Sequence, residues 1–487
     1  MAFEPALRAG SATPEADASG LRRVLASPLV LWIAFLLVHL VLGFLAFHSD
    51  GEPLGDVYLV YKPWAQLAQA GSVVGIQSDW VYPIGALVPI MLPLLLGADN
   101  YIGSWLTLVL LLDAGAFAVL TIGRRPRQLM AAWWWLAFLL LLGPIAIGRL
   151  DSVSVPLVIV GLLWLTLRER VAVVMLTAAT WIKVWPAAIL AAVVVAARTR
   201  WQIVVVAATT SLILVILALT FGSGWHVLSF ITMQTGRSLQ VEAPVSTPWM
   251  WEAAFAVPHA FVYYDPVLRT FQVTGDGSTV ASSLMNPLLG IAVVVVLLIG
   301  IRAVRAGAPM TRLLPTLSLA LVATFIVFNK VGSPQYITWL AAPVVIGLVY
   351  RGRAFRTPAI LVAITAMLTQ VLYPNVYLLV LNVHPAGLAV LTLRNIMLLV
   401  VLGWSMWSLW RAAYPVADNT DELPVRVWPF SALPVEDQDD EDTHEDAHDD
   451  VRESHDAGRG GSGHVDDGIP APTHPGTGAS GPLETKE

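Results

Sequence analysis

One carboxylate, Asp56, stands in an aromatic-rich segment, residues 55–64, shortly after the first long apolar run of the chain. A carboxylate beside aromatic rings at a membrane interface can act as a general base with a moderately raised pKa. Asp is also a favoured N-cap residue, so Asp56 could instead begin a helix over residues 57–70, and the two roles are compatible. Asp56 is therefore the candidate catalytic residue, and Tyr58 and Lys62 are candidate substrate-binding residues.

Arg149 and Asp151 form a second polar point, between two apolar runs. The two side chains could form a local ion pair that caps the following helix. Alternatively, Asp151 could orient a sugar or a metal ion, and Arg149 could bind a phosphate. Both residues are candidate substrate-binding residues.

Lys183 lies in the middle of an apolar run, residues 171–197, close to Pro186. A charged group at membrane depth is costly and usually faces a polar cavity, although snorkelling to the interface is the alternative. Lys183 is therefore a candidate phosphate or pyrophosphate contact. Tyr82, which precedes the proline that opens another apolar run, is a further candidate substrate-binding residue.

Polar residues also gather in two segments predicted to lie on one side of the membrane. Arg237, Gln240 and Glu242 combine planar donors with a carboxylate, which suits phosphate and sugar hydroxyl groups. Lys330 and Gln335 stand between two apolar runs and are predicted at the mouth of the corresponding helices. All five are candidate substrate-binding residues.

The elements that must position these residues are membrane helices. The 487-residue chain is 56% hydrophobic and 13% charged, against roughly 25% charged in soluble domains. Its mean hydropathy is +0.70. No cysteine is present, which excludes disulfides and thiolate metal sites. The composition predicts an all-α polytopic protein whose main solvent is lipid.

Charge divides the chain into three parts. From residue 418 onward, 19 acidic and 4 basic residues give −15, so the remaining 24 basic and 15 acidic residues give +9. We expect a cytoplasmic N-terminal arm over residues 1–27, a transmembrane domain over 28–411 and a disordered acidic cytoplasmic tail over 412–487. His444 and His448 in this tail fit a zinc-protease motif, but an acidic, self-repelling run lacks the stable helix that such a site needs.

The apolar runs and the arginines between them predict the topology. Arginines in short loops favour the cytoplasmic side of what we expect to be the plasma membrane. If all arginine clusters lie there, ten runs cross fully, residues 84–97 are re-entrant and residues 171–197 form a broken hairpin; otherwise twelve runs cross. In the first arrangement the segments outside the membrane are residues 48–100, 148–151, 222–282, 329–335 and 374–387.

The order of the polar motifs resembles one known family. The segments that carry the resemblance are Asp56-x-Tyr58…Trp64-Ala65, Tyr82-Pro83, Gly148-x-x-Asp151, Lys183-Val184-Trp185-Pro186, Arg237-x-Leu239-Gln240-x-Glu242 and Ser333-Pro334-Gln335-Tyr336. Together, over roughly residues 29–411, they are similar to the polyprenol-phosphate-mannose-dependent mannosyltransferases of glycosyltransferase family 87, in the GT-C superfamily. The chain departs from the family pattern at Ile84, where a second proline is usual, and at Gln335, which replaces a histidine motif.

The resemblance implies a GT-C-like helical bundle that binds a sugar donor and an acceptor. Asp56 would be the general base for the acceptor hydroxyl, and the donor would be a sugar, most often mannose, on a polyprenyl phosphate. Lys183 and Arg237 would hold the donor phosphate, with Gln240 and Glu242 near the sugar. The acceptor would be an envelope lipid or glycan on the extracytoplasmic side, and the reaction would invert the anomeric centre.

Two other classes of function remain open from the sequence. A transporter or flippase of lipid-linked sugars would explain Lys183 and the broken run around it, although no internal repeat is seen. A scaffold acting through the acidic tail is the third reading. No cofactor is implied; a divalent metal shared by Asp56 and Asp151 is an option that we do not expect. The chain shows no nucleotide fold and no nucleic-acid-binding surface.

Overall fold

The structure is a computed structural model, and it describes residues 20, 23–233, 237–266 and 268–414. Most of the N-terminal arm, nearly all of the acidic tail and the His444–His448 motif lie outside the described residues.

The described α-helices are α2 (Pro28–His48), α3 (Lys62–Gln69), α4 (Leu87–Met91), α5 (Tyr101–Thr121), α6 (Pro126–Leu142), α7 (Asp151–Trp164), α8 (Glu169–Ile182), α9 (Pro186–Ala196), α10 (Arg200–Thr220), α11 (Ser229–Thr232), α12 (Thr247–Ala254), α13 (Ser278–Arg305), α14 (Met310–Val327), α15 (Ala341–Arg351), α16 (Arg356–Gln370), α17 (Tyr377–Leu381) and α18 (Pro385–Arg411).

Short 3₁₀ and π turns extend or connect these helices. They cover Val57–Tyr61, Ile84–Ala86, Leu92–Leu96, Gly143–Ala146, Gly224–Leu228, Pro244–Ser246, Pro334–Leu340, Gly352–Phe355 and Val371–Asn375. Among the described residues the strands are β1 (Phe261–Asp265) and β2 (Thr270–Thr274), an antiparallel hairpin in which Phe261 lies opposite Thr274.

The helices confirm an all-α protein that crosses a membrane several times. In the described part of the chain, eight helical stretches are long and apolar enough to span a bilayer. One of them, Pro334–Asn375, contains two helices, α15 and α16, separated by the turn Gly352–Phe355. Shorter apolar helices include Ile84–Leu96, Asp151–Trp164 and Pro186–Ala196.

Burial separates the central helices from those that face lipid. Nearly every residue of α7, α14 and α15 is buried, as expected for helices that are apolar on all sides. Helices α2, α10, α13 and α18 instead expose long rows of leucine, isoleucine and valine. These rows would be costly in water and are therefore lipid-facing.

The apolar run around Lys183 is broken and turns back on itself. Helix α8 ends at Ile182 and α9 begins at Pro186. Thr199, just after α9, donates a hydrogen bond to Glu169 at the start of α8, so the two outer ends of this hairpin meet. Its tip lies beside the middle of α10, where Trp181 donates to Ser211 at 3.0 Å. Lys183 is thus placed partway along the bundle.

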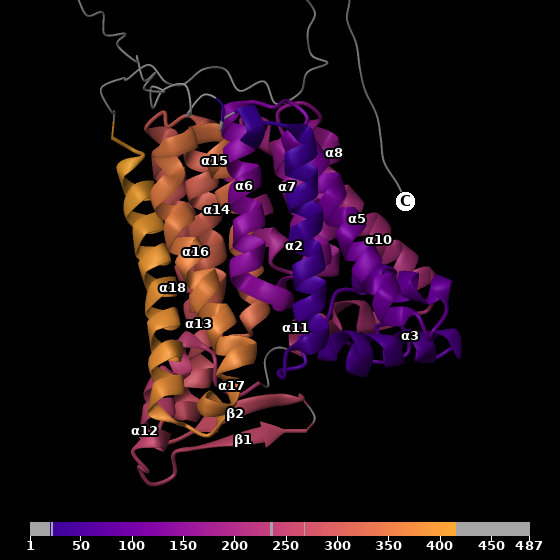
Figure 1. Cartoon of the computed structure of the whole chain (residues 1–487), viewed down its shortest axis with the longest axis vertical. Helices are drawn as coiled ribbons and strands as arrows, with labels where there is room; N and C mark the ends of the chain where they lie inside the picture. Colours follow the sequence, from indigo (N-terminus) through magenta and orange to yellow (C-terminus); the bar gives the residue numbers. More distant parts are fainter. Residues whose placement is uncertain (1–19, 21–22, 234–236, 267, 415–487) are drawn as a thin grey trace, which may run out of the picture. The chain divides into compact units, whose positions relative to one another are not determined.

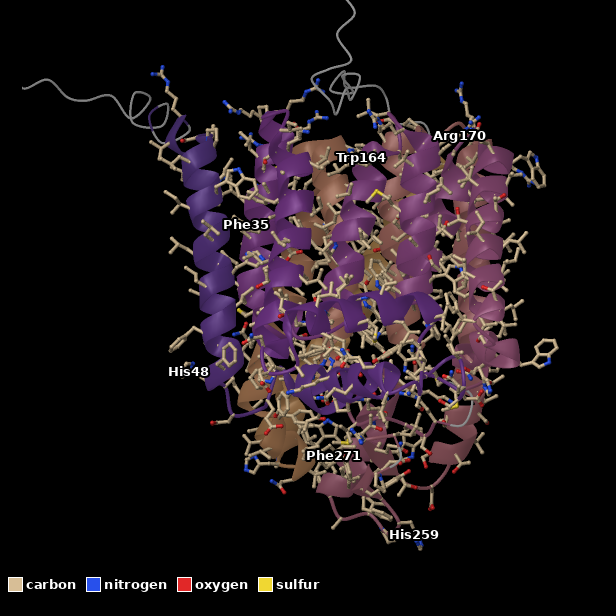
Figure 2. The ribbon with its side chains drawn as sticks, turned by 90° about the vertical axis from the view of Figure 1, so that its right-hand side faces the viewer. Phe35, His48, Trp164, Arg170, His259 and Phe271 are labelled. Carbon is tan, nitrogen blue, oxygen red and sulfur yellow. The ribbon has the colours of Figure 1, made fainter. Side chains whose placement is uncertain are left out.

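The two ends of the bundle differ in what they carry. Trp164 and Arg170 lie at one end, and His48, His259 and Phe271 lie at the other (Figure 2). Helices α3, α12 and α17 and the β-hairpin gather at the second end, below the long helices (Figure 1). We call this second end the loop end; it holds the candidate site.

Candidate functional site

Asp56 forms an ion pair with Arg149 at the loop end. Arg149 Nε lies 3.1 Å from Asp56 Oδ2, and the Tyr61 hydroxyl donates to the same oxygen at 3.5 Å. Asp56 stands at the N-cap position of the helical segment that begins at Val57, which agrees with one of the two roles considered from the sequence, but its side chain makes no capping hydrogen bond. Oδ1 has no hydrogen bond within the described residues. Because the side chain is 33% exposed, this oxygen is available to accept a proton from a ligand.

Arg149 is itself held rigidly. Its Nη1 donates to the Pro53 carbonyl at 2.5 Å and to the Gly148 carbonyl at 2.9 Å. Burial lowers the pKa of Arg149, but the Asp56 carboxylate together with Tyr373, Tyr61 and Tyr82 outweighs burial and raises the pKa. Arg149 therefore stays charged and fixes the orientation of Asp56.

Asp151 pairs with Lys183 and not with Arg149. The local ion pair between Arg149 and Asp151 that the sequence suggested is therefore wrong. Lys183 Nζ lies 3.4 Å from Asp151 Oδ2 and 4.6 Å from the centre of the Tyr82 ring. Trp339 Nε1 donates to Asp151 Oδ1 at 2.5 Å. The lysine charge is thus satisfied inside the protein.

Aromatic rings form a wall around this second pair. Tyr82 packs edge-on against Trp80 and Trp64, at centroid distances of 5.6 and 6.0 Å. On the other side, Trp339 stacks on Tyr336 at 4.2 Å and on Trp185 at 5.8 Å. Such contacts hold the rings rigidly and keep the lysine–aspartate pair away from bulk water.

Two cations, Arg237 and Lys330, lie close together near the same wall. Burial, and then the Arg237 charge, lower the pKa of Lys330. Arg237 Nε is buried and has no hydrogen-bond partner within the described residues. Tyr336 interacts electrostatically with both Arg237 and Lys183, which connects the cations to the aromatic wall. Two neighbouring positive charges repel each other, so a bound anion would relieve an unfavourable interaction.

Gln240 and Glu242 are more deeply buried in the protein than a sugar-binding role suggests. Gln240 Nε2 donates weakly to Ser333 Oγ at 3.4 Å. Glu242 Oε1 accepts from the Tyr377 hydroxyl at 2.6 Å, and Arg394 Nη2 donates to the Glu242 carbonyl at 3.0 Å. Burial raises the pKa of Glu242 even though the Tyr377 hydrogen bond opposes the shift. These contacts tie the segment after Arg237 to α17 and α18.

The remaining predicted residues are not brought into these clusters by any described contact. Tyr58 hydrogen-bonds towards Glu52. The side chains of Lys62 and Gln335 make no hydrogen bond or ion pair within the described ranges. In the sequence, nothing distinguishes Tyr61 and Trp339 from ordinary interfacial aromatics, and Tyr336 appears there only as part of the Ser333–Tyr336 motif; the contacts of all three emerge only from the fold.

No group of three or more His, Asp or Glu side chains arranged to hold a metal ion occurs among the described residues. Comparison of the chain with known protein families, with characterised proteins and with solved structures finds no match.

Proposed function

We propose that the protein is a membrane glycosyltransferase that moves a sugar, mannose in the first instance, from a polyprenyl-phosphate donor to an envelope lipid or glycan. The observation that carries the proposal is the way in which the Asp56 carboxylate is held. Arg149 and Tyr61 occupy one carboxylate oxygen and leave the other open at the loop end. A fixed carboxylate with one free oxygen suits a general base. The loop end would be the extracytoplasmic side.

The reaction follows from these positions. Asp56 Oδ1 takes the proton of an acceptor hydroxyl while the acceptor oxygen forms a bond to the anomeric carbon. The bond from that carbon to the phosphate oxygen breaks, and its electron pair leaves with the polyprenyl phosphate. Attack opposite the leaving group inverts the anomeric centre through an oxocarbenium-like transition state, as in glycoside hydrolysis.

The leaving phosphate gains negative charge during this step. Arg237 and Lys330, whose charges lie close together, are the groups that would stabilise it. Lys183 is less suited to this role than the sequence suggested, because Asp151 already neutralises it. In this scheme Lys183 and Asp151 instead hold the aromatic wall between the base and the phosphate.

A detergent assay tests the transferase and separates it from a flippase. The purified protein is incubated with radiolabelled polyprenyl-phosphate-mannose and an envelope lipid extract, and product is separated by chromatography. A flippase forms no product in detergent because there is no bilayer to cross. The buried pair of Lys183 and Asp151 is the feature that would favour a flippase. Absence of product together with donor translocation in vesicles would replace our proposal with that function.

A further inference from the structure

A groove runs along the lipid-facing surface between α2 and α5. Its lining is almost entirely apolar and comes from one face of each helix and from Ile147. The residues that matter here are Leu40, Gly43, Phe44 and Phe47 on α2 and Leu106 and Leu110 on α5. Leu40, Phe44 and Phe47 are 68%, 61% and 60% exposed, so the groove opens towards lipid and not into the bundle.

The helices are tied together on the side away from the loop end. The Trp32 ring packs on Phe117 at a centroid distance of 5.3 Å, and His39 Nε2 lies 3.1 Å from Asp113 Oδ2. The other histidine nitrogen, Nδ1, lies 2.9 Å from the Phe35 carbonyl. Both ring nitrogens of His39, which lines the groove, therefore already have partners, and the groove offers a ligand chiefly apolar contacts.

One lining residue of the groove, Ile147, belongs to the segment that carries Arg149, the partner of the candidate base. Ile147, which lines the groove, comes two residues before Arg149. The chain that leaves α2 at His48 passes over this point, because the Pro53 carbonyl accepts a hydrogen bond from Arg149. Asp56, the partner of Arg149, follows three residues later. A molecule with its hydrocarbon part in the groove would thus present its polar head to Asp56.

The groove has the length of one lipid chain in one leaflet. Its α2 lining runs from Leu36 to Phe47, roughly 17 Å of helix. One leaflet of the hydrocarbon core is about 15 Å thick. An acyl chain fits this length, whereas a polyprenyl chain is much longer. The phosphate-binding cations, Arg237 and Lys330, belong to a different cluster of residues, connected through Tyr336.

We propose that the acceptor is a lipid whose acyl chain lies in the groove between α2 and α5. The inference rests on the transferase function proposed above, and it names the acceptor class that this function left open. Asp56 must face the acceptor hydroxyl, so we assign the groove, whose lining residue Ile147 lies two residues before the Asp56 partner Arg149, to the acceptor and not to the donor. A soluble glycan would have no use for an apolar groove open to lipid.

Synthetic acceptors of different chain length test this assignment. Methyl, octyl and dodecyl mannosides are compared as acceptors in the detergent assay with a fixed donor. For the wild type we expect kcat/KM to rise about tenfold or more from methyl to dodecyl, because each added methylene buries apolar surface. Equal values for all three acceptors would overturn the inference.

Gly43 offers a variant that fills the groove without disturbing the fold. A Cβ atom at Gly43 would meet no heavy atom within 4 Å, and the same is true of Gly115, an exposed glycine on α5 that does not line the groove. We expect Gly43→Phe to raise KM for dodecyl mannoside about tenfold and to leave methyl mannoside and the donor unchanged. Gly115→Phe should behave as wild type. A selective rise in KM for the donor would assign the groove to the polyprenyl chain and contradict us.

Photolabelling separates failure of this inference from failure of the transferase proposal. A dodecyl mannoside with a diazirine in its chain is crosslinked to the purified protein and mapped by mass spectrometry. Labelling of residues 36–47 and 106–110 that dodecyl mannoside competes and Gly43→Phe abolishes would support the groove even if no transfer occurred. Label spread over α10 and α13, or not competed, would show only bulk lipid contact and would overturn the inference.

Discussion

At the residue scale, two ion pairs join distant segments of the chain, Arg149 with Asp56 and Lys183 with Asp151. Arg149 and Asp151 are two positions apart, and side chains at this spacing do not face each other at the start of a helix. Arg149 therefore reaches Asp56, and Asp151 reaches Lys183. Both partners come from distant segments, and no local pattern could have predicted the pairing. Tyr61 and Trp339 were missed for the same reason.

The lowered pKa of Lys330 leads to a pH prediction. Because the folded-state pKa lies below the ordinary value for lysine, Lys330 loses its charge at a lower pH than a solvent-exposed lysine. If Lys330 helps to bind the donor phosphate, KM for the donor should rise as pH increases through that lowered pKa. Lys330→Arg should remove this rise, since arginine stays charged at any accessible pH.

The measurement is KM for polyprenyl-phosphate-mannose between neutral and alkaline pH, for wild type and Lys330→Arg. Identical pH profiles of KM for the two proteins would show that loss of the Lys330 charge does not affect donor binding.

At the element scale, most of the helices could be predicted because arginine-rich turns separate long apolar runs. The break at Lys183 and the turn back at Pro186 were predictable for the same reason. The hairpin of β1 and β2 was not predicted, because the whole segment 222–282 was interpreted as a loop, although Phe261–Asp265 is rich in aromatic residues and Thr270–Thr274 alternates polar and apolar side chains. Nor could composition show that α7, α14 and α15 are central, since most of the longer helices are strongly apolar.

The break between α8 and α9 should depend on its buried ion pair. Lys183→Met leaves Asp151 without its cation in a buried site, where its side chain is only 1% exposed. We expect a loss of about 3–5 kcal/mol in the free energy of unfolding. The double variant Lys183→Met, Asp151→Asn should recover much of this loss, because no uncompensated charge remains.

Unfolding in mild detergent, followed by the fluorescence of the buried tryptophans, measures both variants. A double variant that is as unstable as the single one would mean that Lys183 stabilises the hairpin through packing alone.

At the scale of the whole molecule, the arrangement places two sets of loops at opposite ends. Arg170 and His259 are exposed and lie at different ends of the bundle (Figure 2). The number of full crossings and the orientation in the membrane stay predictions from the arginine distribution. The arrangement of the helices follows from apolar packing within the protein. The orientation of the protein depends on the membrane and on how the chain is inserted into it.

Cysteine labelling can determine this orientation because the chain has no cysteine of its own. We expect His259→Cys to react with a membrane-impermeant maleimide in intact cells and Arg170→Cys to react only after permeabilisation. The reverse pattern would place Asp56 in the cytoplasm and rule out an extracytoplasmic transfer. Reaction of both variants in intact cells would contradict the helix arrangement itself.

The role of Asp56 is the central claim, and one substitution tests it most directly. Asp56→Asn keeps the shape of the side chain but removes the base, whereas Asp79→Asn changes an exposed carboxylate whose only described partner is His226. The measurement is the rate of mannose transfer in detergent together with donor binding in the same preparations. The account predicts that Asp56→Asn loses transfer by about 10²-fold or more and binds donor normally, while Asp79→Asn retains both. Transfer by Asp56→Asn at the wild-type rate would show that Asp56 is not the base.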